Sequence, residues 1–90
     1  MARARHSPID QALSALHEAI TRPDRITQIK ASLSNANVFH LIINSAHRSF
    51  LEGKLNEIEQ ARNSPPDLRR IGEEIDRWND REFPTHRGFR

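Results

Sequence analysis

Residues 38–43, with the sequence Val-Phe-His-Leu-Ile-Ile, place the strongest constraint on how this 90-residue chain can fold. On a helix these side chains are apolar on almost every face, although 29% of the residues in the chain are charged and only 36% are hydrophobic. A helix that is apolar all round has to be covered on all sides. A chain of this length has a modest core of its own. The stretch therefore predicts a helical assembly in which a partner, most simply a second copy, covers part of it.

Capping signals and apolar residues at helical spacing predict two short helices in the first part of the chain. Ser7 and Pro8 are a typical helix start, and Pro23 ends this first helix near Thr21. Pro23 and Asp24 open a second helix. The polar residues 34–37, Ser-Asn-Ala-Asn, indicate a break before the third helix, although one continuous helix is also compatible with the pattern.

The third helix is expected to be long and central, over residues 38–62. About 25 helical residues span about 37 Å, whereas a compact globule of this chain length is about 30 Å across. This mismatch is a second reason to expect oligomerisation. The candidate partner interface consists of the apolar residues at the start of this helix and their neighbours: Val38, Phe39, Ile42, Ile43, Ala46, His47 and Phe50.

A fourth helix should follow the turn at Pro65 and Pro66 and end near Glu82, because Pro84 comes soon after it. Its apolar residues recur three and four positions apart: Leu68, Ile71, Ile75 and Trp78. This spacing describes one buried stripe. We therefore expect Trp78 to pack in the core.

The residue types that carry catalysis and metal binding are absent or poorly spaced. The chain has no cysteine, and its three glycines are isolated, so there is no phosphate-binding loop. His40 and His47 are seven residues apart, whereas a two-histidine helical metal site uses a spacing of four. They are expected at the edge of the apolar face; a metal site shared in a dimer and a pH-sensitive contact are the alternatives. The carboxylates alternate with Arg and Lys, which is typical of surface ion pairs. We expect no enzymatic activity, no cofactor and no metal.

The positive charge behind the net charge of +2 is located in the two ends of the chain, which carry +2 each, whereas the rest of the chain carries −2. Residues 1–6 contain Arg3 and Arg5, and residues 84–90 contain Arg87 and Arg90, whereas residues 64–82 hold six acids against four bases. The last fourteen residues also interleave basic and aromatic side chains, a composition found both in nucleic-acid contacts and in protein-binding tails. The candidate phosphate contacts are Arg3, Arg5, Arg87 and Arg90.

Together these features predict an all-α bundle of about four helices with one long central helix, completed by oligomerisation. The domain is expected over residues 7–83, between basic tails at 1–6 and 84–90. The expected function is a small protein–protein interaction module that associates with itself. The alternative is a nucleic-acid-binding regulator with a helical dimer body and basic tails. We expect no signal peptide, because no apolar run follows the basic residues 1–6, and no stretch is long enough to span a bilayer, so a cytoplasmic location is expected.

Overall fold

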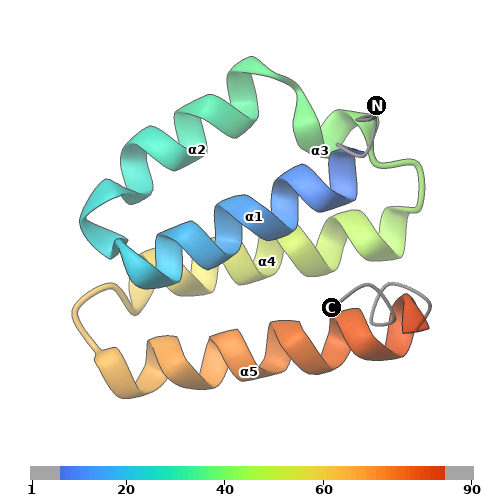
Figure 1. Cartoon of the computed structure of the whole chain (residues 1–90). Helices are drawn as coiled ribbons and strands as arrows, with labels where there is room; N and C mark the ends of the chain where they lie inside the picture. Colours follow the sequence, from blue (N-terminus) through green and yellow to red (C-terminus); the bar gives the residue numbers. More distant parts are fainter. Residues whose placement is uncertain (1–6, 85–90) are drawn as a thin grey trace, which may run out of the picture.

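The computed structural model describes residues 7–84, and within that range it is all-α, without strands (Figure 1). Five α-helices and one short 3-10 helix follow one another along the chain. Their bounds are α1 Pro8–Thr21, η1 Pro23–Arg25, α2 Ile26–Asn35, α3 Val38–Leu41, α4 Ser45–Gln60 and α5 Pro65–Glu82. The all-α class is thereby confirmed, with one more helix than the sequence pattern indicated. Arg3, Arg5, Arg87 and Arg90 lie outside the described residues.

The predicted ends of the first helix and the predicted break after the second are confirmed, whereas Pro23 opens a 3-10 helix and α2 begins only at Ile26. The Ser7 hydroxyl accepts a hydrogen bond from the Asp10 amide at 3.1 Å, and Pro8 takes the first position of α1. After α2, Asn37 adopts a left-handed backbone conformation with φ of 55°. Asparagine tolerates this conformation better than most residues. The helical path therefore breaks at Asn37, and α2 and α3 are not continuous.

The long third helix was the main error of the sequence interpretation. The chain leaves the helical path at Ile42, which is extended with φ of −81° and ψ of 112°, and α4 starts only at Ser45. The Asn44 side chain caps the new helix by accepting hydrogen bonds from the amides of Ala46 and His47, at 2.9 and 3.1 Å. Side chains of this type compete with helix continuation and favour a fresh start. Instead of one helix over residues 38–62 there is a single turn, a link at residues 42–44 and a helix of 16 residues.

The central helix is α1 rather than the expected third helix. It packs against α2, α3, α4 and α5, and Figure 1 shows it between α2 and α5 with α4 behind it. Ala12, Leu16 and Ala19 of α1 are completely buried. The two small alanine side chains leave room for neighbouring helices to approach closely, which explains why this short helix can be surrounded.

The hydrophobic core is closed within one chain. It draws on all five α-helices, and no polar or charged residue among those described is buried with it. The radius of gyration is 12.8 Å, close to the roughly 12 Å expected for a compact domain of this length. The stripe of Leu68, Ile71, Ile75 and Trp78 is buried as predicted, with Trp78 6% exposed. Completion of the core therefore gives no reason to expect a partner, and oligomerisation stays a prediction that has to rest on the surface.

Candidate interaction surface

The candidate interface residues divide between the core and the surface. Val38 and Ile42 are each 2% exposed, so they pack inside their own chain and are not available to a partner. Ile43 is 94% exposed, and its neighbour Leu41 is 58% exposed. These two are the large hydrophobic residues that residues 7–84 leave exposed. Leu41 was missed from the sequence because a continuous helix would have placed it off the predicted stripe.

The link that carries Ile43 is fixed on both sides. Ile42 is buried before it, and the Ile42 carbonyl accepts hydrogen bonds from Nε and Nη2 of Arg48, at 3.3 and 2.9 Å. After it, Asn44 is held by its capping bonds to the first turn of α4. Ile43 thus projects from a tethered backbone, and less conformational entropy would be lost when it is buried in a contact.

A groove lies between α2, α3 and α4. It has a volume of about 530 Å³. We call it the α2–α4 groove, and it is lined by Lys30, Leu33, Ser34, Asn37, Phe39, His40, Glu52, Leu55 and Asn56. Leu33 and Leu55 are each 5% exposed and Phe39 is half-buried, so the apolar part of the lining is set into the core. His40, which the sequence placed at the edge of the apolar face, belongs to this groove.

His47 and Phe50, two further candidate interface residues, are engaged with α5. The Phe50 ring stacks on Trp78 with centroids 4.3 Å apart, and the His47 ring meets the edges of Trp78 and Phe83 at 5.4 and 5.2 Å. Nε2 of His47 lies 3.2 Å from a carboxylate oxygen of Glu82. These residues therefore fasten the start of α4 to the end of α5. Ala46, the remaining candidate, is exposed.

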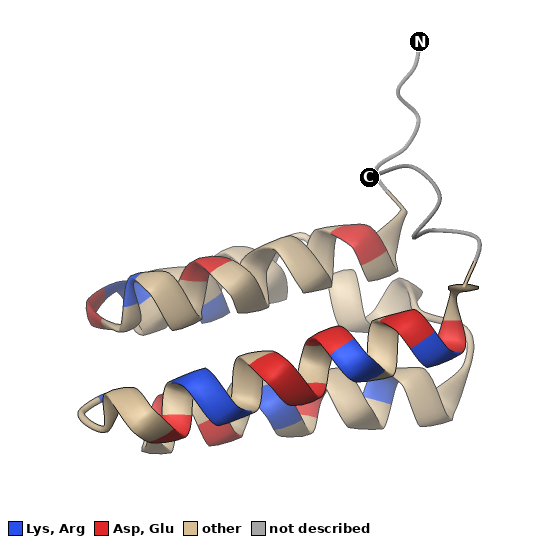
Figure 2. Cartoon of the chain, turned by 60° about the horizontal axis from the view of Figure 1, so that its bottom comes forward, with Lys and Arg blue, Asp and Glu red and all other residues tan. Residues whose placement is uncertain are grey.

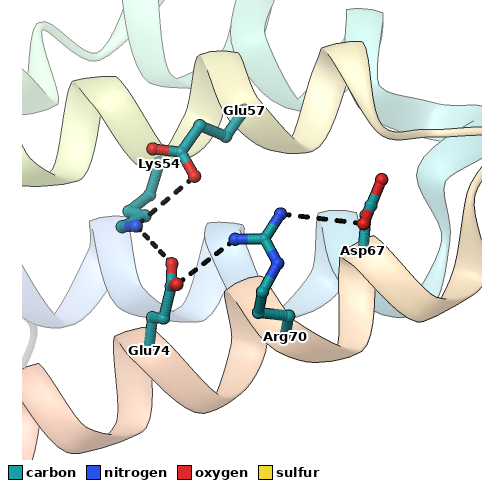
Figure 3. A network of polar contacts seen from close by, with 5 residues as sticks. All are labelled: Lys54, Glu57, Asp67, Arg70 and Glu74. Carbon is teal, nitrogen blue, oxygen red and sulfur yellow. Dashed lines mark hydrogen bonds and ion pairs between the residues drawn. The ribbon is translucent and has the colours of Figure 1, made fainter.

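Glu57 of α4 and Glu74 of α5 are carboxylates held in ion pairs. Figure 3 shows Lys54 of α4 between Glu57 and Glu74, with Arg70 on the other oxygen of Glu74. The hydrogen bond from Lys54, at 2.5 Å, lowers the pKa of Glu74 below its usual value, and Arg70 adds to the effect. A carboxyl group held ionised in this way is suited to joining α4 to α5, and it is poorly suited to donating a proton.

Neither a cluster of metal-ligating side chains nor a membrane-spanning helix occurs in the described part of the chain. Among residues 7–84, no group of three His, Cys, Asp or Glu side chains is placed to hold a metal ion. Over the same range, no helix has both the length and the apolarity needed to cross a bilayer.

Charge is distributed unevenly over the fold. Residues 31–47 contain no Lys, Arg, Asp or Glu, and they include the end of α2, all of α3 and the start of α4. In Figure 2 both signs of charge alternate along α5, whereas α3 is free of charged residues. Charge is depleted in the same way at the centres of protein–protein interfaces.

Both described chain ends lie at the same end of the bundle as α3. Figure 1 shows α1 starting and α5 ending there. Residues 1–6 and 85–90, which carry the four candidate phosphate-contacting arginines, are attached at these points. Residues 7–84 themselves hold ten Lys and Arg against twelve Asp and Glu.

No protein-family model, curated protein or solved structure was found to match this chain. Any functional assignment therefore has to come from the surface of the molecule itself.

Proposed function

We propose that this protein is a small helical interaction module without catalytic activity, which binds protein and principally a second copy of itself. The contact is made by Phe39 and Leu41 of α3, Ile43 of the link and Ala46 of α4. The observation that carries the proposal is the 94% exposure of Ile43 on a backbone tethered at both sides. On this proposal the protein acts in the cytoplasm. A reducing compartment suits this chain because it has no cysteine and so forms no disulfide.

The energetics support a weak, reversible contact. Fully burying a large apolar side chain is worth about 1.5–3 kcal/mol, and a symmetric dimer would bury Leu41 and Ile43 twice, for roughly 6–12 kcal/mol at most. Association costs about 4–15 kcal/mol in lost freedom of motion. The net free energy of association is small because most large apolar side chains are already buried in the core of their own chain. A dissociation constant in the micromolar range or weaker is therefore expected.

Sedimentation velocity over about 10 µM to 1 mM protein tests this proposal. The protein should shift from monomer to dimer as its concentration rises. Ile43→Ser should abolish the shift with an unchanged circular dichroism spectrum, because Ile43 contributes little to the core. The matched control, Ile43→Leu, keeps an apolar side chain and should still dimerise. A wild-type protein that remains monomeric throughout would refute self-association.

A second candidate function, nucleic-acid binding, is favoured by one observation. The described chain ends lie at one end of the bundle, so both arginine-bearing segments are attached at that end. Since the body between them carries more acids than bases, phosphate contacts would depend on Arg3, Arg5, Arg87 and Arg90.

Binding to a DNA duplex, measured against salt concentration, tests this second function. Each phosphate contact contributes about −0.9 to the slope of log K against log salt. Replacing all four arginines by glutamine should flatten the slope and remove the affinity. An equal affinity of the replaced protein would exclude these residues as the contacts, and no binding by either protein in low salt would exclude the function.

A further inference from the structure

We propose that the α2–α4 groove of one copy receives Ile43 of a second copy, and that the two copies make this contact reciprocally about a two-fold axis. The inference rests on the proposed self-association and goes beyond it by stating which surface meets which. The occupant is thus a particular side chain of the same protein.

The shapes of the two surfaces suit each other. Ile43 is a single branched side chain that projects into solvent from the link at residues 42–44. The groove offers about 530 Å³. Most of its lining is polar, and its apolar part comes from Phe39 and from the largely buried Leu33 and Leu55. An apolar anchor side chain that enters a recess on the partner is the usual centre of a protein–protein contact.

The projecting residue and the groove also lie on the same part of the molecule. Phe39 lines the groove from α3, and Ile43 follows only four residues later. A two-fold interface requires that one patch contain both halves of the contact, because residue i must meet residue j while j meets i. Their proximity satisfies this requirement and favours a closed dimer.

Charge favours a second copy over a charged partner. No Lys, Arg, Asp or Glu occurs between residues 31 and 47, so few like charges face each other when two copies meet here. The charged group beside Ile43 is Arg48, which donates to the Ile42 carbonyl. The charged residues in the groove lining, Lys30 and Glu52, have opposite signs, and Nζ of Lys30 donates to Glu59 at 2.7 Å. A polyanion such as nucleic acid would find no net positive charge in this groove.

The absence of cysteine from the chain permits a direct test. Ile43→Cys protein is mixed with Asn56→Cys protein under mild oxidation, where Asn56 is an exposed residue of the groove lining. The control mixture pairs Ile43→Cys with Thr27→Cys, an exposed residue of α2 that does not line the groove. We expect the 43–56 disulfide to form several-fold faster than the 43–27 disulfide and than either disulfide between identical chains.

The outcomes separate this inference from the proposed function. A dominant 43–43 disulfide would mean that the two Ile43 side chains meet each other; self-association would stand and the groove contact would be wrong. A wild-type dimer with no preference for the 43–56 pair leads to the same conclusion. A wild-type protein that stays monomeric in sedimentation overturns both.

A complementation experiment tests the same contact without cysteine. Ser34→Arg, at an exposed position in the lining, should block the groove and weaken dimerisation about tenfold or more, as should Ile43→Ser. Mixed together, the two variants can form one intact contact, since one supplies the open groove and the other supplies Ile43. The mixture should therefore associate more strongly than either variant alone. If mixing gives no gain, the reciprocal contact is wrong.

Discussion

Replacing Trp78 with alanine should remove a large part of the stability of this protein. Trp78 is 6% exposed, stacks on Phe50 with centroids 4.3 Å apart and meets the rings of His47 and Phe83 edge-on. Truncating a core tryptophan to alanine costs about 3–5 kcal/mol. A chain of this length has a total stability of roughly 4–13 kcal/mol, so the variant would lose between about a quarter of it and all of it.

Urea and thermal unfolding, followed by circular dichroism, measure this loss. At about 4–8 °C per kcal/mol for a domain of this size, the Tm should fall by roughly 12–40 °C. Ile43→Ala is the matched control, because it also truncates a large apolar side chain, but one that is 94% exposed. It should change stability by no more than about 0.5 kcal/mol. A Trp78→Ala loss below about 1 kcal/mol would mean that the aromatic contacts between α4 and α5 are not maintained in solution.

Further predictions concern the two helical glycines and the ion pair between α4 and α5. Gly53→Ala should raise stability by about 0.5–1 kcal/mol in urea unfolding, since an added Cβ would meet nothing within 4 Å. Gly72→Ala should gain less, because its Cβ would lie 3.4 Å from Ile20. Glu74→Gln should cost about 1 kcal/mol or less at neutral pH, because it breaks the ion pair with Lys54. The folded pKa of Glu74 is lowered from 4.5, so its contribution is present above that value and disappears as the pH falls through the folded pKa. The wild-type and Glu74→Gln stabilities should therefore converge in acid, and a constant difference between them would contradict this reasoning.

Local signals were sufficient for most helix ends. Ser7 and Pro8 start α1, and Pro65 starts α5, because a capping hydroxyl and a proline in the first turn act within three or four residues. The stripe from Leu68 to Trp78 was also predicted correctly, since its regular spacing leaves a single apolar face.

The candidate site was only partly predictable, because the apolar run around α3 is consistent with more than one backbone path. Interpreted as a continuous helix, this run predicted that Ile42 and Ile43 would both belong to the partner interface. The break at residues 42–44 instead turns Ile42 into the core and Ile43 into solvent. The asparagine at position 44 was the available signal for a new helix start, and it had been interpreted as helix interior.

The sequence by itself determined that this chain is helical, where most of its helices begin and end, and that Trp78 belongs to the core. These features depend on interactions between residues three or four positions apart. Only the tertiary structure decided that α1 is central, that the core closes within one chain and that Leu41 and Ile43 remain outside it. Those outcomes depend on which helices meet. An apolar side chain favours burial wherever it occurs in the sequence. Whether it is covered depends on packing among segments far apart in the chain.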